Sequence, residues 1–400
     1  MATFVRKTFI TLILSLVAVL LINYSWQKRK VVNKNFSFNT QESRSLRYFP
    51  RAMYAYGLQA WFESNPLAAA RFFRQTVHDN PFHIDGWLKL AQAEAAVGHE
   101  ERSRSILEFT YNLTKPVFRW KWKQMLLARE LRLEDVFLQI ADYFLARGRI
   151  TNNIFQLIDA HYNGAVTKIA GAFRKEHLVP YLEWLMRWDR AEDAHFVWQK
   201  IVSAQRVDEE IILKYVHFLI NKKHIIEANK IWGKFTGIKG MTNGDFEVDI
   251  TRRGFGWRYR GNRNWEIKRV KLPDSTGSFA LQVAFYGKKN ISFHHLYQIV
   301  PVEPLRHYLM KYRWKSTGIT TDQRPFVEIY GYDIKGLYKK GQMITGTNDW
   351  RQGTVEFMSP ENCHAVVIRL RRLTSKRFDC NIEGTIYLDN FSLNILNEQS

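Results

Sequence analysis

The chain contains 400 residues, of which 46% are hydrophobic and 24% are charged. This length predicts two or three domains, and the apolar content is ample for sizeable cores, which excludes a wholly disordered chain. The formal net charge of +21 favours acidic partners such as anionic lipid, acidic polysaccharide or nucleic acid. A basic surface that only aids solubility is the alternative.

Residues 1–30 have the pattern of a transmembrane signal-anchor. An apolar run from Phe9 to Ile22 follows Arg6 and Lys7. With its neighbours, the run approaches the roughly 20 residues that a helix needs to cross a bilayer. A cleaved signal peptide is the alternative, but no small-x-small cleavage site follows the run. We therefore predict an uncleaved helix that anchors the chain in a membrane.

Two opposing signals bear on the orientation of this anchor. The basic residues at 28–30 favour a cytoplasmic body by the positive-inside count. A short tail before a first apolar helix is instead typical of a signal-anchor, and the C-terminal half has the texture of an extracytoplasmic domain. We predict a single-pass protein of the inner (cytoplasmic) membrane with the bulk of the chain periplasmic or extracytoplasmic, and a linker at residues 31–46.

Residues 47–238 contain a repeat of 34 residues. Four positions recur at this interval by subtraction: Tyr181 as Tyr215, Leu185 as Leu219, Ala194 as Ala228 and Trp198 as Trp232. Such a period is typical of helical hairpins, because one hairpin cannot bury its apolar face alone and must stack on its copies. These residues resemble the tetratricopeptide repeat (TPR), most strongly at 52–116 and 181–235. The resemblance implies an α-solenoid whose concave groove binds a protein partner.

After residue 238 the pattern changes to the two-residue alternation of strands. Eight segments show it: 266–272, 279–285, 296–302, 308–315, 326–332, 353–357, 365–372 and 385–395. We predict that residues 239–400 form an antiparallel β-sandwich (jelly roll), so that the fold class is multidomain, α then β.

Several short motifs of this half resemble the jelly-roll carbohydrate-binding modules of the galactose-binding-like group. They are residues 243–247 (Asn-Gly-Asp-Phe-Glu), Trp257, residues 296–302 (Leu-Tyr-Gln-Ile-Val-Pro-Val), Asp349-Trp350 and residues 387–393 (Tyr-Leu-Asp-Asn-Phe-Ser-Leu). The resemblance implies that Glu247 and Asp389 help to hold a structural calcium ion. Acids that only cap turns are the alternative, because calcium takes six to eight oxygens. No other cofactor is expected.

Aromatic residues of this half are candidates for stacking on sugar rings, because a rigid aromatic face packs on the apolar face of a pyranose at little entropic cost. The candidates lie near predicted loops or strand ends: Trp257, Tyr259, Trp265, Tyr330 and Tyr332. Burial in the core of the sandwich is the alternative for each of them.

Basic residues alternate with bulky apolar ones in two predicted strands. Alternation places Lys311, Arg313 and Lys315 on one face of a strand, and Arg369 and Arg371 on one face of another. If both strands lie in the same sheet, the five cations form a surface that suits an anionic saccharide, because Arg pairs bidentately with carboxylate, sulfate and phosphate. A solvated outer face is the alternative.

Cys363 and Cys380, the only two cysteines, flank the strand at 365–372 and the turn after it. A hairpin that brings them together would allow a disulfide in an oxidising compartment. Two free thiols are the alternative.

Signatures of common enzymes are absent from the sequence. It contains no Gly-x-x-x-x-Gly-Lys-Ser/Thr, Gly-x-Ser-x-Gly, His-Glu-x-x-His or Cys-x-x-Cys motif. We predict a non-catalytic, membrane-anchored scaffold whose repeats bind a protein partner and whose jelly roll binds a saccharide, and the resemblances imply a part in assembly or export of a bacterial cell-envelope polysaccharide. A carbohydrate-active enzyme, hydrolase or lyase, with its site in the sandwich and a cytoplasmic-facing nucleic-acid-binding protein are the alternatives.

Overall fold

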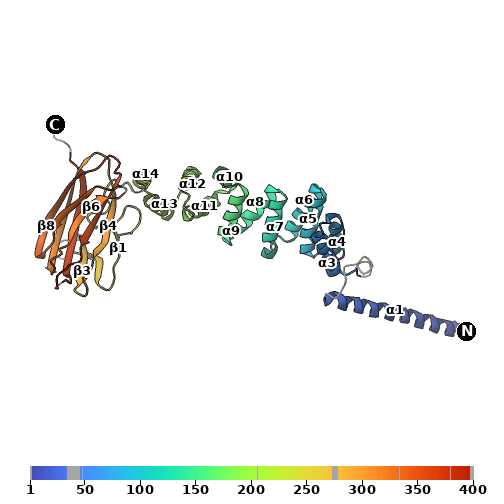
Figure 1. Ribbon diagram of the computed structural model, residues 1–400. Coiled ribbons are helices and arrows are strands. Elements are labelled where there is room, and N and C mark those ends of the chain that lie inside the picture. Colours follow the sequence, from blue (N-terminus) through green and yellow to red (C-terminus); the bar gives the residue numbers. More distant parts are fainter. Residues whose placement is uncertain are drawn as a thin grey trace. The chain divides into compact units, whose positions relative to one another are not determined.

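The structure is a computed structural model that describes residues 2–33, 46, 48–204, 206–272, 278–332, 334–378 and 380–396, with side chains from residue 12 onward. These residues form 13 helices followed by ten strands (Figure 1). The predicted order, helices first and strands second, is therefore confirmed. The chain divides into two compact units, Met1–His177 and Leu178–Ser400.

The predicted domain boundaries stay predictions, and residues 34–45 of the predicted linker lie outside the described residues. The division into units differs from the predicted boundary at 238/239, because the last helices group with the strands. The helices that lie in the first unit are α1 (Ala2–Val32), α3 (Pro50–Phe62), α4 (Pro66–Asp79), α5 (Ile84–Val97), α6 (Glu100–Leu113), α7 (Phe118–Glu130), α8 (Glu134–Leu145), α9 (Thr151–His161) and α10 (Val166–Ala172).

The expected membrane anchor requires a correction. No helix of the described part of the chain is long and apolar enough to span a membrane. The physical reason lies in α1: its described apolar side chains, at residues 12–22, give way to Asn23 and then to Lys28, Arg29 and Lys30. This stretch is shorter than the roughly 20 apolar residues that a bilayer demands. The predicted inner-membrane location is thus contradicted.

The remaining helices are α11 (Lys175–Arg187), α12 (Ala191–Ala204), α13 (Glu209–Asn221) and α14 (Ile225–Thr236). The residues that recur at 34 positions in these helices are all buried: Tyr181, Leu185, Ala194, Trp198, Tyr215, Leu219, Ala228 and Trp232. Trp198 stacks on Tyr215, with 4.5 Å between ring centroids. The recurring positions thus form the contacts between successive helices.

The turns between paired helices recur at the same interval. Ser64, Gly98 and Arg132 have φ angles of 57°, 96° and 56°, and each follows the previous one by 34 residues. Asp189 and Lys223, with φ of 64° and 63°, are also 34 residues apart. A left-handed residue ends a helix by satisfying its last carbonyl groups. The sequence repeat is therefore matched by a repeat of backbone geometry.

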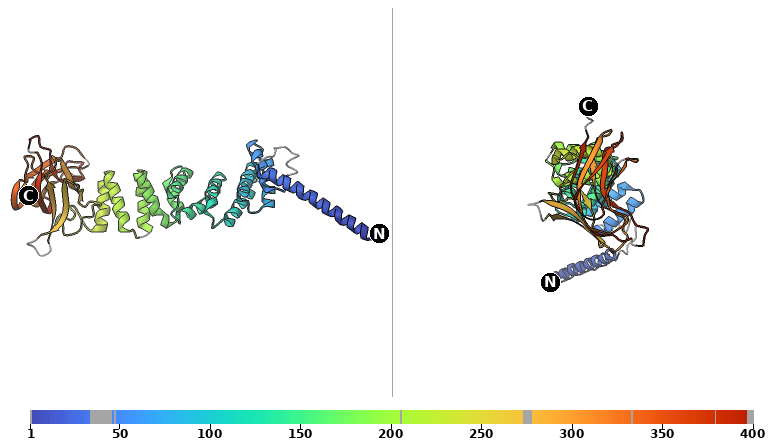
Figure 2. Two further views of the ribbon diagram at one scale, coloured as in Figure 1. Left: turned by 90° about the horizontal axis from the view of Figure 1, so that it is seen from below. Right: turned by 90° about the vertical axis from the view of Figure 1, so that its left-hand side faces the viewer.

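The strands form two five-stranded antiparallel sheets, seen from two further directions in Figure 2. Sheet 1 has the order β1-β4-β9-β6-β7, and sheet 2 has the order β2-β3-β10-β5-β8. The strands are β1 (Arg258–Tyr259), β2 (Trp265–Lys271), β3 (Phe279–Tyr286), β4 (Phe293–Pro301), β5 (His307–Ile319), β6 (Phe326–Gly331), β7 (Tyr338–Met343), β8 (Gly346–Met358), β9 (Ala365–Arg372) and β10 (Glu383–Ile395). All eight predicted strands are found, and β1 and β7 were missed. The predicted β-sandwich is confirmed.

Side-chain alternation builds the core between the sheets. In β5, Tyr308, Met310, Tyr312 and Trp314 are buried in the sandwich core, whereas the residues between them face outward. Each sheet therefore has an inner apolar face and an outer face on which polar side chains stand.

The last helical hairpin packs against the sandwich within the second unit. The ring of Trp232 on α14 meets Phe255, with 6.0 Å between centroids, and the Tyr332 hydroxyl donates to the carbonyl of Ile220 on α13 at 3.1 Å. Gly254 has φ +54°, and a Cβ there would lie 2.2 Å from a ring carbon of Trp232. The loop can approach the indole this closely only because the residue is glycine.

The expected disulfide is also corrected. Cys363 and Cys380 are not bonded to each other. Cys363 lies just before β9, whereas the carbonyl of Cys380 accepts a hydrogen bond from Arg372, the last residue of β9. The eight residues of the strand separate the two cysteines by about 25 Å, far beyond the reach of a disulfide.

Candidate functional site

A cavity of about 550 Å³ lies on the outer face of sheet 2. Outward-facing side chains of β3, β5, β8 and β10 form it, together with a segment just before the strands. Its lining residues are Glu247, Val270, Lys271, Leu272, Ser278, Gln282, Arg313, Lys315, Thr317, Trp350, Tyr387, Asp389 and Asn390. This size lies in the range of sites that hold small ligands.

Two aromatic residues, both half-buried, give the cavity its apolar surface. The guanidinium of Arg313 stands over the Trp350 ring, 4.9 Å from its centroid. The Tyr387 hydroxyl accepts a hydrogen bond from Gln282 Nε2 at 2.9 Å. These contacts connect neighbouring strands and orient the side chains that line the cavity.

Basic and acidic groups share the cavity. Lys315 Nζ lies 3.1 Å from Asp349 Oδ1, and this hydrogen bond holds the pKa of Asp349 below its usual value. Burial raises the pKa of Asp389, and the nearby carboxylates of Glu247 and Asp245 raise it further, against a hydrogen bond from the backbone and the charge of Arg313. The cavity is therefore polar at both ends and mixed in charge, rather than the uniformly cationic surface that we expected.

The predicted calcium ligands, Glu247 and Asp389, do line the same cavity. Glu247 Oε1 accepts a hydrogen bond from the Phe279 amide at 2.9 Å, and Asp389 Oδ1 accepts one from the Asn390 amide at 2.7 Å. Two carboxylates attract a cation, but calcium takes six to eight oxygens. A structural calcium ion at this place stays a prediction.

A group of three metal-ligating side chains lies elsewhere in the described part of the chain, at Asp142, Glu176 and His177. Arg174 Nε lies 3.1 Å from Asp142 Oδ1, and His177 Nε2 lies 2.8 Å from the same oxygen. This group is an ion-pair network that neutralises its own charge, and we do not treat it as a metal site.

The two basic strands do not share a sheet, so the condition for a single cationic surface is not met. Lys311, Arg313 and Lys315 stand on β5 in sheet 2, whereas Arg369 and Arg371 stand on β9 in sheet 1. Sheet membership depends on strand pairings between residues far apart in sequence, which alternation does not encode.

The two arginines of β9 are engaged in contacts on sheet 1. Arg369 forms an ion pair with buried Glu328 and donates to the Tyr330 hydroxyl at 3.1 Å. Arg371 donates to Ser292 Oγ at 2.9 Å. These side chains stabilise the outer face of sheet 1 and do not line the cavity.

The predicted aromatic candidates do not line the cavity either. Trp257 and Trp265 are 2% and 5% exposed, and their ring nitrogens donate to the carbonyls of Asn243 and Arg260. The Arg252 guanidinium stands over Tyr259, and Tyr332 is bonded to α13. Their burial follows the alternative stated above, in which aromatic residues fill the core and its edges.

Sequence reasoning left three lining residues out of the candidate site: Gln282, Trp350 and Tyr387. The strand predicted at 353–357 begins three residues after Trp350, but β8 begins at Gly346. Extending the alternation of that strand backward would have placed Trp350 on the outer face. Tyr387 likewise alternates with the inward-facing Ile386 and Leu388.

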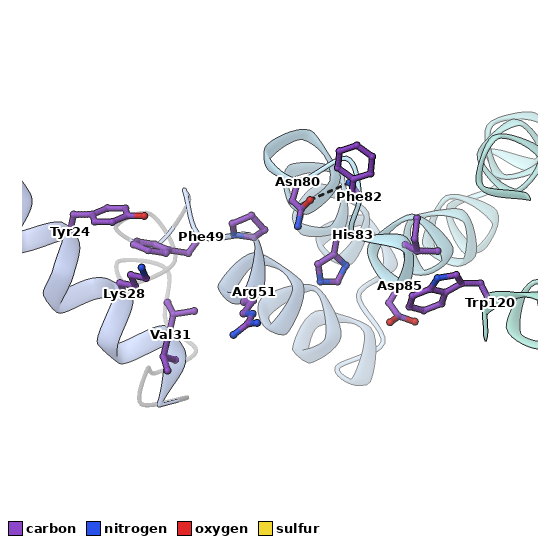
Figure 3. A pocket seen from close by; sticks show the side chains of 13 residues that line it. Tyr24, Lys28, Val31, Phe49, Arg51, Asn80, Phe82, His83, Asp85 and Trp120 are labelled. Carbon is purple, nitrogen blue, oxygen red and sulfur yellow. Dashed lines mark hydrogen bonds between the residues drawn. The ribbon is translucent and has the colours of Figure 1, made fainter. Parts of the chain in front are cut away.

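A second cavity, of about 610 Å³, lies in the first unit. Figure 3 shows side chains from the end of α1, including Tyr24 and Lys28, opposite Arg51, His83 and Trp120. Tyr24 stacks on Phe49 with 5.3 Å between centroids. None of the predicted saccharide-binding residues lies in it, so we place the candidate site in the cavity of sheet 2.

No protein-family model matches the sequence, and no curated protein matches it significantly. Among solved structures, the chain is similar to the enzymatically active domain of tailspike protein 4 of bacteriophage CBA120, at 17% identity and a TM-score of 0.30, over 40% of this chain and 22% of the tailspike chain. It is also similar to a family 4 carbohydrate-binding module (15% identity, TM-score 0.29, 39% of this chain, 99% of the module). A third similarity is to a family 61 module in complex with β-1,4-galactotriose (16%, 0.29, 40% and 99%). At such identities and TM-scores we base no functional conclusion on these similarities.

Proposed function

We propose that the chain is a binding protein that holds a saccharide in the cavity of sheet 2. The observation that carries this proposal is the combination of lining groups: half-buried Trp350 and Tyr387 beside Gln282, Arg313 and Asp389. Sugars present apolar ring faces and a rim of hydroxyl groups. Aromatic side chains stack on the former, and amides, carboxylates and guanidinium groups hydrogen-bond the latter.

Arg313 favours a saccharide that carries an acidic group. Its guanidinium can pair bidentately with a carboxylate or sulfate, and Lys271 and Lys315 line the same cavity. The acidic wall at Glu247 and Asp389 then accepts hydrogen bonds from hydroxyl groups of the same ligand. The proposed ligand class is therefore an acidic oligosaccharide that also exposes neutral hydroxyl groups.

The test is calorimetry of the full chain against an acidic oligosaccharide, oligogalacturonate, and a neutral one, cello-oligosaccharide, at two salt concentrations. We expect Trp350→Ala to weaken binding at least about fivefold, which corresponds to ~1 kcal/mol of lost stacking. Arg313→Ala should weaken binding of the acidic ligand alone and remove its dependence on salt. Loss of neither effect in a wild-type chain that binds would place the site elsewhere, and binding of no glycan on a wider array would reject the proposal.

Two matched controls separate local from general effects. Trp188→Ala removes another exposed tryptophan, 58% exposed, and Arg371→Ala removes an arginine of sheet 1. Both variants should bind as wild type does. An equal loss in Arg371→Ala would indicate that charge in general, rather than the cavity, attracts the ligand.

We further propose that the helices form a TPR-like arm that binds a protein partner, so that the whole chain acts as a non-catalytic scaffold in polysaccharide assembly or export. The 34-residue spacing of buried residues and of left-handed turns supports this proposal. A stable complex that survives Trp350→Ala but is lost on substitution of exposed residues of the helices would support it.

One observation favours a second candidate function, a carbohydrate-active enzyme. Asp389, whose pKa is raised by burial, lines a cavity with a second carboxylate, Glu247. Two carboxyl groups in different protonation states are what glycoside hydrolysis requires. Release of reducing ends that is abolished by Asp389→Asn, with binding retained, would favour the enzyme over the scaffold.

A further inference from the structure

A third cavity, of about 660 Å³, lies within the second unit between α12 and α14. The second helices of the last two hairpins form its walls, and His364, which directly precedes β9, lines it as well. We call it the basic groove. Its lining residues are His195, Trp198, Gln199, Val202, Lys223, His224, Ile225, Ile226, Glu227, Lys230, Ile231, Lys234, Phe235 and His364.

The charge of the basic groove is strongly one-sided. Lys223, Lys230 and Lys234 line it, and among the described residues none of the three forms an ion pair. The one carboxylate of the lining, Glu227, is already engaged by hydrogen bonds with His195 and with the Tyr215 hydroxyl. Three lysines thus face the groove without a neutralising acid.

The same groove exposes apolar surface. Ile226 is 66% exposed and Phe235 is 40% exposed at its rim. Phe235 meets the buried ring of Trp198 edge-on, with 6.4 Å between centroids. Side chains this apolar are normally buried, and clustered exposure of them is typical of surfaces that contact a protein.

Charge and apolarity together select the class of occupant. A polysaccharide or nucleic acid satisfies lysines but leaves Ile226 and Phe235 in water. An acidic amphipathic polypeptide segment satisfies both, because its carboxylates pair with the lysines while its apolar side chains cover the floor. We infer that the basic groove is a docking site for an acidic, apolar-anchored segment of a partner protein. This site is distinct from the saccharide cavity, since the two share no lining residue.

The test compares two acidic polymers on the full chain by fluorescence anisotropy: a labelled random copolymer of glutamate and tyrosine, and poly-L-glutamate of the same length. We expect the copolymer to bind about tenfold more tightly, because only it supplies apolar anchors. The variant Lys230→Glu/Lys234→Glu should weaken copolymer binding about tenfold or more. Phe235→Ala should weaken binding of the copolymer and leave that of poly-L-glutamate unchanged.

The matched control is Lys168→Glu/Lys175→Glu. It changes the net charge by the same amount at two exposed lysines of α10 and α11 that lie outside the groove. This control and Arg313→Ala should both bind the copolymer as wild type does. Circular dichroism verifies that each variant is folded, and Ile226→Ser provides a second groove variant that leaves the charge unaltered.

Three results would overturn the inference. Equal affinity for the copolymer, poly-L-glutamate and dextran sulfate would mark a general polyanion surface. Equal losses in the groove variant and in its charge-matched control would mean that net charge alone attracts the polymer. Binding that Arg313→Ala removes, while the groove variants retain it, would place the polymer in the saccharide cavity.

Discussion

Lys121 on α7 is a charged residue held in the interior of the first unit. It is fully buried, and its Nζ donates to the carbonyl of Tyr111 at 3.1 Å and to Gln124 Oε1 at 3.3 Å. It also lies 3.9 Å from the centroid of the Tyr111 ring. Burial lowers the pKa of Lys121 to about 8, with a smaller contribution from Lys115. A neutral acceptor and a ring face replace only part of the lost hydration.

This burial predicts a dependence of stability on pH. Between the folded pKa of about 8 and an unfolded value of about 10.4, the unfolded chain binds more protons, so stability rises with pH. Lysine 121 should contribute a rise of about 2–3 kcal/mol in the free energy of unfolding across this window. Urea unfolding of wild type and Lys121→Met at a series of pH values measures it as the difference between the two profiles.

The control for this measurement is Lys123→Met, which removes an exposed lysine two positions along the same helix. Its profile should run parallel to that of the wild type from pH 8 to 10.5. Parallel profiles for Lys121→Met and wild type would show that the buried ammonium is solvated in solution.

At the scale of elements, Arg372 joins the end of β9 to three neighbouring segments. The side chain is fully buried, and it donates to Asn290 Oδ1 at 2.9 Å, Thr321 Oγ1 at 3.1 Å and the carbonyl of Cys380 at 2.6 Å. It also donates to the carbonyl of Ile291. One guanidinium therefore satisfies acceptors before β4, after β5 and before β10.

We predict that Arg372→Met destabilises the sandwich by about 3 kcal/mol or more, because several buried acceptors lose their donor at once. Arg351→Met, at an exposed position of β8, is the control and should change stability by less than about 0.5 kcal/mol. Chemical unfolding followed by tryptophan fluorescence measures both. Similar values for the two variants would mean that water replaces the guanidinium.

Sequence patterning predicted the elements but not their pairing. The alternation in β5 correctly assigned Tyr312 and Trp314 to the core and Arg313 to the surface. The neighbours of Arg313 across the sheet, Gln352 and Asp389, are set by pairings between distant segments. The site residues Trp350 and Tyr387 become visible only when those pairings are known, and for the same reason the expected union of β5 with β9 was wrong.

At the scale of the whole molecule, the contact between Gly254 and Trp232 joins the last hairpin to the sandwich. Gly254→Ala would place a methyl group against the indole in addition to straining a positive φ. We expect the free energy of unfolding to fall by about 1–3 kcal/mol more than in a variant that only strains the backbone. Calorimetry of the full chain measures the loss.

Gly336→Ala supplies that comparison, because Gly336 has φ +99° and nothing within 4 Å of its added Cβ. The difference between the two variants isolates the steric cost at Trp232. Equal losses would indicate that the loop moves away from the helix without cost. The joint also explains why binding experiments should use the full chain, since a fragment starting at residue 240 would leave Phe255 and Tyr332 without their helical partners.

The positions of the two thiols give the protein a built-in reporter. Cys363 is buried at one end of β9, and Cys380 is partly accessible at the other. A maleimide dye should therefore label Cys380 while the protein is native and reach Cys363 only after the sandwich opens. Mobility on a denaturing gel should not change with reductant in the monomer, and any band of doubled mass that forms in air should disappear in a Cys380→Ser variant.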